Sequence, residues 1–429
     1  FMLVKPFGIL VLRAAKRSFS SKPRMANMLV SIIVLCCPIA ALSQEPAIQS
    51  HKLATSWMQL ITKKAQQEAL PPPPSLRLYA YAGITMYECM AACLPGKASI
   101  YQKISGQPLL AAREGNFHLP AVLNAATARL CQQLGIFKST SPFDSLEAAL
   151  TPQAGGSLTP EKLQASILLG KNIADAIVAW SQTDGNEKPL PPLSVSTQAG
   201  AWLMPENVTL PQTGIALTQW RLFLPGLPGA ADPGPPPAYS EKEGSRFRSY
   251  AEEVFQLRNN LSPQDSATAI FWKNNPPRQT NTMGHMQKLL VSLVEKESPG
   301  LEDAITLYAK HGMLMHDVIA CSFFYKHQYR CQNPVTYIRQ VMNQPAWNTL
   351  YFYNYYPGYP SNQVSLVEAS AAFMERAFGK SYAFTDSANG AGAMARQYTS
   401  FRNMSRERAI SLLQSGIDFR FSTDAAKSM

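Results

Sequence analysis

The chain has 429 residues, of which 46% are hydrophobic and 10% aromatic, so it can bury a sizeable core and is not a disordered protein. The formal charge of +11 is concentrated at the start: residues 1–43 hold six basic residues and no acid, which leaves +5 for the remainder. No basic stripe with interleaved aromatic residues is present, so the composition argues against a nucleic-acid-binding protein.

An apolar run, Met28–Leu42, lies within this basic N-terminal region. It is too short to span a bilayer comfortably. Residues 41–43, Ala-Leu-Ser, place small side chains at both positions that a signal peptidase reads. We expect residues 1–43 to be an upstream extension plus a signal peptide that is cleaved before Gln44. The mature protein is then exported to the periplasm or the extracellular space, without stable membrane insertion.

Residues 44–429 are predicted to form a single all-α domain, because apolar residues recur at helical spacing and no run alternates as a strand would. Thr159 and Ser262 are each followed by proline, which favours a capped helix start. The prolines at 71–74 are expected to end the first helix. The predicted helices cover residues 51–70, 75–94, 117–136, 159–185, 240–257, 263–274, 300–330, 365–379 and 405–419.

Residues 185–238 differ from the rest of the chain because proline is too frequent for a helix there. Trp202 and Trp220 lie between the proline clusters and argue against a free linker. We therefore expect an ordered but irregular segment that wraps over the helical bundle.

Cysteine and histidine give no conventional site. Five cysteines lie outside residues 1–43, and an odd number cannot all be paired in disulfides. Cys89 and Cys93 are four apart in a predicted helix, but no second pair or nearby histidine completes a metal site, so we interpret them as small core residues. His311 and His316 do not share a helical face well. No metal site is predicted.

Three short segments in the last third of the chain stand at informative spacings. Lys326 is followed by six residues and then Asn333-Pro334. A loop-to-helix corner reads Pro360-Ser361-Asn362-Gln363. Ser411-Leu412 is followed by five residues and then Asp418.

These spacings resemble the signature of the vanadium-dependent haloperoxidase and type 2 phosphatidic acid phosphatase superfamily, which reads K-x6-R-P, P-S-G-H and S-R-x5-H. Further similar segments run in the family's order from about residue 52 to 425, and the secreted, bacterial haloperoxidase-like branch is the most similar. The resemblance implies a helical bundle that holds vanadate or phosphate through cations, a serine and a glycine N–H. One histidine then ligates vanadium or attacks phosphorus, and another acts as acid and base.

Only two of the family's site residues are matched here. The oxyanion-binding positions implied by the resemblance are Lys326 and Ser361, which match, and Asn333, Asn362 and Leu412, which do not. The catalytic positions are Asp418, in place of the vanadium-binding or nucleophilic histidine, and Gln363, in place of the acid-base histidine.

We therefore expect a haloperoxidase-like protein with a degenerate oxyanion site and weak or lost catalysis, a pseudoenzyme. No resident cofactor is expected, although the resemblance implies vanadate or phosphate, and a small anion or small molecule would be the partner. The alternative is an active enzyme with rewired phosphoester hydrolysis or haloperoxidation that uses Lys326 and Asp418. A structural helical protein with coincidental spacing is a third hypothesis. The candidates to replace the lost arginines are Arg330, Arg339, Arg402, Arg406 and Arg420.

Overall fold

A computed structural model of the chain describes residues 50–111, 115–190, 196, 198–203, 213–274, 279–351, 356–388 and 394–429. Contacts divide the chain into residues 1–44 and residues 45–429. The predicted signal peptide and its cleavage site lie outside the described residues. In the described part of the chain, no helix has both the length and the apolar character that crossing a membrane requires.

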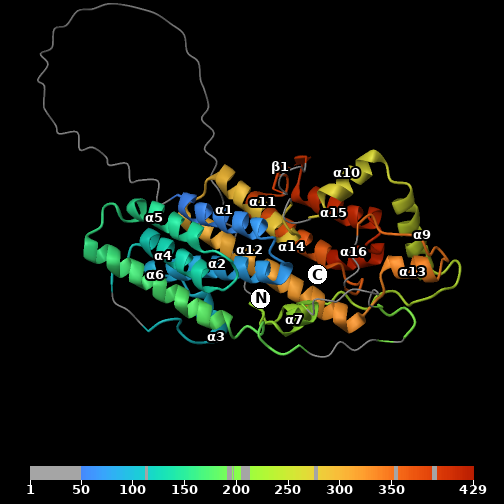
Figure 1. The fold of residues 1–429 in the computed structure, drawn as a ribbon, viewed down its shortest axis with the longest axis horizontal. Coiled ribbons are helices and arrows are strands. Elements are labelled where there is room, and N and C mark those ends of the chain that lie inside the picture. Colours follow the sequence, from blue (N-terminus) through green and yellow to red (C-terminus); the bar gives the residue numbers. More distant parts are fainter. Residues whose placement is uncertain are drawn as a thin grey trace, which may run out of the picture. The chain divides into compact units, whose positions relative to one another are not determined.

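The described part of residues 45–429 is a helical bundle with a small two-stranded ribbon (Figure 1), which confirms the predicted all-α class. The helices are α1 (Lys52–Gln67), α2 (Pro72–Cys93), α3 (Ile100–Ser105), α4 (Leu119–Gln133), α5 (Ser141–Gly155), α6 (Pro160–Ser181), α7 (Thr213–Ala216), the 3₁₀ turn η2 (Leu217–Gln219), α8 (Leu227–Ala230), α9 (Arg246–Asn259), α10 (Pro263–Phe271), α11 (Thr282–Glu297), α12 (Leu301–Tyr329), α13 (Pro334–Gln340), α14 (Asn362–Phe378), α15 (Phe401–Gln414) and α16 (Arg420–Lys427). Strands β1 (Phe384–Asp386) and β2 (Arg396–Tyr398) pair antiparallel.

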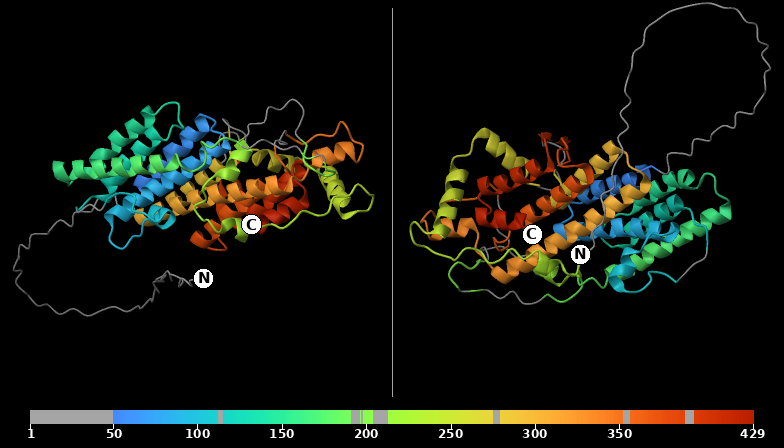
Figure 2. Two further views of the ribbon diagram at one scale, coloured as in Figure 1. Left: turned by 90° about the horizontal axis from the view of Figure 1, so that it is seen from below. Right: turned by 180° about the vertical axis from the view of Figure 1, so that it is seen from behind.

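Helices α2 and α12 pack against each other in the middle of the bundle. Helix α12 runs between α2, α4 and α6 on one side and α14, α15 and α16 on the other (Figures 1 and 2). The two backbones approach closely at glycine: a Cβ atom on Gly312 would lie 2.5 Å from the carbonyl oxygen of Tyr79. Two long, largely apolar helices in close contact account for the core onto which the remaining helices pack.

A second core supports the C-terminal part of the bundle. It is aromatic and lies between α9, α13 and α16. Phe247 contacts Tyr337, Phe419 and Phe421 with ring centroids 5.4, 5.4 and 5.6 Å away, and Phe419 stacks on Phe421 at 4.9 Å. Because Phe419 is anchored in this way, the preceding residue, Asp418, is held in place as well.

Some helix boundaries differ from the prediction. Helix α2 begins at Pro72 rather than at residue 75, because proline suits the first helical turn, where its missing N–H is not needed. For the same reason the Pro-rich segment contains short helical turns that we did not expect, among them α8 with Pro228 in its first turn. The structure also adds α3, α5, α11, α13 and α16 to the predicted set.

The predicted packing of the Pro-rich segment on the bundle is confirmed where the structure describes it. Leu217, Trp220 and Phe223 are buried in the main core. The backbone N–H of Trp202 donates to the carbonyl of Arg330 at 2.7 Å, beside the end of α12. This part of the chain is therefore ordered without being a long helix.

Candidate functional site

The three motif segments meet at helix ends. Lys326 lies in the last turn of α12, and Asn333 precedes α13. Ser361 is the N-cap of α14, and the peptide bond before Pro360 is cis. Asp418 follows α15, in the short connection to α16.

The loop before α14 is hydrogen-bonded to the segment before α13 and to the start of α16. The N–H of Gly358 donates to the carbonyl of Cys331 at 2.8 Å, and the Ser422 hydroxyl donates to the carbonyl of Gly358 at 2.6 Å. The N–H of Ser361 donates to the carbonyl of Ser422 at 3.2 Å. A Cβ atom on Gly358 would lie 2.8 Å from the Asn333 Oδ1 atom, so this position accepts only glycine without a shift.

Lys326 is a buried cation with an internal partner. Lys326 is only 3% exposed, and its Nζ atom donates to the carbonyl of Pro357 at 2.5 Å. Burial lowers the pKa of Lys326 to about 8, although the charge of Asp418 opposes this shift. The ammonium group is thus engaged by the loop that leads into α14.

Asp418 and Ser361 form a direct contact. The Ser361 hydroxyl donates to Asp418 Oδ2 at 2.5 Å, and its oxygen also accepts from the N–H of Val364 at 3.3 Å. Burial raises the pKa of Asp418, and it outweighs the opposing influence of Lys326, of the Ser361 hydrogen bond and of Arg408. Lys326, Ser361 and Asp418 therefore form one buried polar cluster.

The other motif positions are also buried. Asn333 Nδ2 donates to the carbonyl of Tyr356 at 2.9 Å, so this side chain fastens the loop instead of facing outward. Leu412 is fully buried in a small apolar cluster with Val364 and Ile417. Asn362 and Gln363 form the start of α14 and are 7% and 6% exposed.

An arginine that we did not predict lies beside this cluster. Arg408 is fully buried, and Nη1 donates to the carbonyl of Trp272 at 2.9 Å and to the Ser411 hydroxyl at 3.3 Å. Its Nε and Nη2 atoms are buried and have no hydrogen-bond partner among the residues that the structure describes. Arg408 is four residues before Leu412 in α15, so the two share a helix face one turn apart, and this spacing was a signal in the sequence.

Most of the arginines that were candidates for compensation have other partners. Arg402 pairs with Glu368 and Glu375, Arg420 pairs with Glu253, and Arg339 donates to the carbonyl of Trp347. Arg420 thus pairs with Glu253, and Asp418, two residues before it, contacts Ser361 instead. These arginines are directed to acids and carbonyls outside the cluster.

Several histidines form buried pairs elsewhere in the bundle. His285 contacts Asp386 at 2.8 Å, His311 contacts Gln287 and Ser370 at 3.1 Å, and His316 contacts Asp317 at 2.8 Å. Cys89 and Cys93 are free thiols. Within the described ranges, no three His, Cys, Asp or Glu side chains are grouped so that they could hold a metal ion.

Comparison with known proteins identifies the fold. No protein-family model matches the sequence, and no curated protein matches it. The structure is similar to a bacterial vanadium-dependent iodoperoxidase, with a TM-score of 0.77 and 21% identity, over 88% of this chain and 94% of that chain. It is also similar to a bacterial vanadium-dependent chloroperoxidase in holo form (TM-score 0.60, 14% identity, 85% of this chain and 93% of that chain) and in apo form (0.58, 15%, 85% and 94%).

The chain therefore has the fold of the bacterial vanadium-dependent haloperoxidases. This confirms the predicted haloperoxidase-like helical bundle.

Proposed function

We propose that this chain is a haloperoxidase-fold protein without vanadate-dependent catalysis, which acts as a binding protein. The observation that carries the proposal is the contact between Ser361 and Asp418. The hydroxyl that would donate to an oxyanion donates to a carboxylate of the chain itself. Lys326 likewise donates to the carbonyl of Pro357.

The residues at the motif positions do not fit vanadate or phosphate. Asp418 carries a carboxylate where the resemblance expects an imidazole, and Leu412 carries no donor. Each charged hydrogen bond to an anion contributes about 1.5 to 3 kcal/mol. Replacing two arginines by Asn333 and Leu412 therefore removes about 3 to 6 kcal/mol, or roughly two to four decades of affinity.

The direct test is to assay the purified chain for bromination of an indicator dye with vanadate and peroxide, and for hydrolysis of an aryl phosphate. We expect neither reaction above the protein-free rate. Gln363 has no titratable group to protonate a leaving oxygen, and Asp418 opposes an anion. Vigorous turnover of either substrate by the wild-type chain would overturn the proposal.

Restoring the family's residues gives a positive control. Single replacements are expected to do nothing, because such groups act as a unit. The combined variant should recover orthovanadate binding before turnover, with folding checked by its thermal unfolding. Its replacements are Asn333→Arg, Asn362→Gly, Gln363→His, Leu412→Arg and Asp418→His.

A second candidate function is an enzyme with rewired chemistry at the same cluster, either phosphoester hydrolysis or haloperoxidation. The observation that favours it is Arg408, a buried positive charge that favours the charged form of Asp418 and has two nitrogen atoms, Nε and Nη2, without a hydrogen-bond partner in the described part of the chain. Titratable groups with shifted pKa values in one cluster are also typical of active sites. Under this hypothesis the wild-type chain turns over a substrate, and Asp418→Asn abolishes that activity.

We also propose that the protein is exported, on the evidence of the apolar run and the small residues at 41 and 43. N-terminal sequencing of secreted material should then begin at Gln44. Recovery of the uncleaved chain from the cytoplasm would contradict this proposal.

A further inference from the structure

A cavity of about 690 Å³ lies where the start of α2 meets the ends of α4 and α6. Its volume is within the range of about 300 to 1,000 Å³ that is typical of small-molecule sites. Arg77, Gln133, Ser181 and Glu187 contribute to its lining, and no residue of the three motif segments does. This cavity is therefore separate from the cluster around Asp418.

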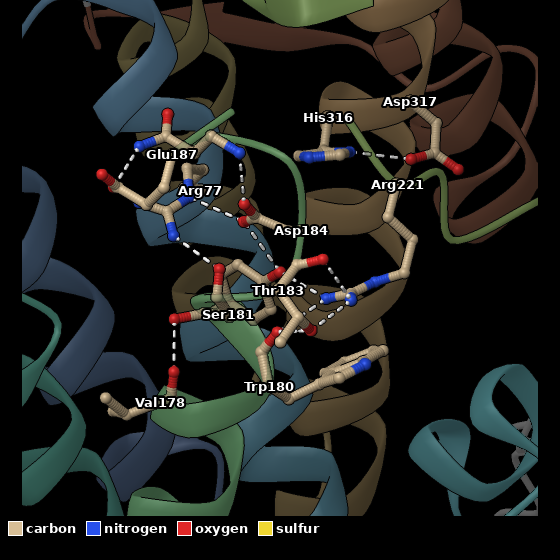
Figure 3. A network of polar contacts seen from close by, with 12 residues as sticks. Arg77, Val178, Trp180, Ser181, Thr183, Asp184, Glu187, Arg221, His316 and Asp317 are labelled. Atoms are coloured by element: carbon tan, nitrogen blue, oxygen red, sulfur yellow. Dashed lines mark hydrogen bonds and ion pairs between the residues drawn. The ribbon is translucent and has the colours of Figure 1, made fainter. Parts of the chain in front are cut away.

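Arg77 is the buried charged side chain of this cavity. The residue is 8% exposed; Nε donates to Asp184 Oδ2 at 2.7 Å and Nη2 donates to the carbonyl of Ser181 at 2.8 Å (Figure 3). Within the described part of the chain, Nη1 makes no hydrogen bond. One face of the guanidinium is thus fixed by the protein, and a remaining N–H donor is left for the cavity.

A network of hydrogen bonds behind Arg77 holds its side chain in place. Asp184 also accepts from the Tyr81 hydroxyl at 3.0 Å and from the N–H of Asn186 at 2.9 Å. Arg221 donates to the same Tyr81 hydroxyl at 3.0 Å. Its Cζ atom lies 4.2 Å from the ring centroid of Trp180 (Figure 3). Arg77 thus contacts Asp184 directly, whereas Arg221 is linked to Asp184 through the Tyr81 hydroxyl.

The end of α6 would make this region negative through its free carbonyl groups. The two arginines offset this effect, because Arg77 donates to the carbonyl of Ser181 and Arg221 donates to that of Trp180 at 3.0 Å. Glu187 is the acidic residue in the lining, and its exposed carboxylate is screened by water and salt. The Nη1 group of Arg77 is therefore the donor with which an anion in the cavity would pair.

We propose that this cavity binds a small organic carboxylate with an apolar body. The carboxylate accepts the free N–H of Arg77, and the body packs against Leu134, Ile136 and Val178, which line the wall. Arginine suits this role because its guanidinium group stays charged and forms charge-assisted hydrogen bonds with a carboxylate. The site is independent of the function proposed for the Asp418 cluster.

The test is calorimetric titration of the full chain with 4-phenylbutyrate and with its neutral isostere, 4-phenylbutanamide. We expect the acid to bind at least about tenfold more tightly, because only the acid forms a charge-assisted bond to Arg77. Val178→Trp, which fills the cavity and leaves Arg77 intact, should abolish binding of both compounds. Glu187→Gln should tighten the binding of 4-phenylbutyrate at low salt, because it removes the negative charge of Glu187 from the cavity lining.

A double variant checks the role of Arg77 without leaving a buried charge unpaired. Arg77→Gln with Asp184→Asn should abolish the preference for the acid, with folding monitored by thermal unfolding. The proposal is overturned by any of four results: equal affinity for acid and amide, full binding by Val178→Trp, weaker binding of the acid by Glu187→Gln, or no binding up to about 10 mM.

Discussion

Lys326 is a buried cation whose hydration shell is replaced, within the described residues, by one hydrogen bond to a carbonyl oxygen. A buried ammonium group loses more solvation energy than one such bond returns, so its proton is held less tightly and its pKa falls to about 8. Asp418 shows the mirror effect, because burial disfavours its charged form and raises its pKa. The two residues therefore make stability depend on pH in ways that an exposed pair would not.

The first prediction concerns the stability of the folded state at alkaline pH. Between pH 8 and the usual lysine pKa, the folded chain has released the Lys326 proton while the unfolded chain still binds it, so this group makes stability rise with pH. The rise should amount to about 3 kcal/mol in all. Urea unfolding of the wild type and of Lys326→Met at pH 7 to 10 measures it, because the difference between the two isolates Lys326 from the tyrosines. Parallel pH profiles would contradict the prediction.

At the scale of elements, helix ends decide where the polar groups of the cluster lie. Thr159 and Ser262 cap their helices as predicted, accepting from the N–H groups of Lys162 at 3.3 Å and Asp265 at 3.1 Å. Ser361 caps α14 in the same way but also donates to Asp418, so one side chain joins a helix start to a segment 57 residues away.

The second prediction compares two capping serines. Ser361→Ala removes a cap, which contributes about 1 kcal/mol, and a bond to a carboxylate, which contributes about 1.5 to 3 kcal/mol. Ser400 caps α15 through the N–H of Asn403 at 3.2 Å, and Ser400→Ala should remove the cap alone. We expect Ser361→Ala to lower the free energy of unfolding by about 2 to 4 kcal/mol and Ser400→Ala to lower it by about 1 kcal/mol, measured by urea unfolding at pH 7.

Ser361→Ala should also raise the pKa of Asp418 further, because the Ser361 hydroxyl stabilises the charged carboxylate. Carboxyl carbon chemical shifts followed by NMR against pH would show this change. Equal destabilisation by the two serine variants, with no change at Asp418, would mean that the bond between Ser361 and Asp418 contributes nothing in solution.

At the scale of the whole described bundle, stability depends on the contact between α2 and α12, since helices on both sides pack onto this pair. Gly83 and Gly312 allow the contact: an added Cβ atom would lie 2.6 Å from the Cα atom of Ala309 and 2.5 Å from the carbonyl oxygen of Tyr79, respectively. Backbone atoms cannot move aside as a flexible side chain would, so the helices themselves would have to separate.

The third prediction follows from this contact. Gly312→Ala should lower the free energy of unfolding by about 1 to 3 kcal/mol or more, because it overpacks the interface. Gly229→Ala in α8 is the matched control, since its Cβ atom would meet nothing within 4 Å. That variant should be neutral or slightly stabilising. Thermal unfolding measures the midpoints of both variants, and the midpoint of Gly312→Ala should be the lower one. Indistinguishable midpoints would contradict the close packing of α2 and α12.

The sequence by itself determined the helical class, the main helix positions, two caps and the segments that supply Lys326, Ser361 and Asp418, because these depend on local periodicity and spacing. Only the tertiary structure decided where long polar side chains point. Arg420 reaches Glu253, Arg77 reaches Asp184 and Arg408 is buried beside Trp272. These partners are 167, 107 and 136 residues apart in the chain, so no pattern of neighbouring residues encodes them. The direction of a flexible charged side chain is set by which distant carboxylate or carbonyl the fold brings within reach.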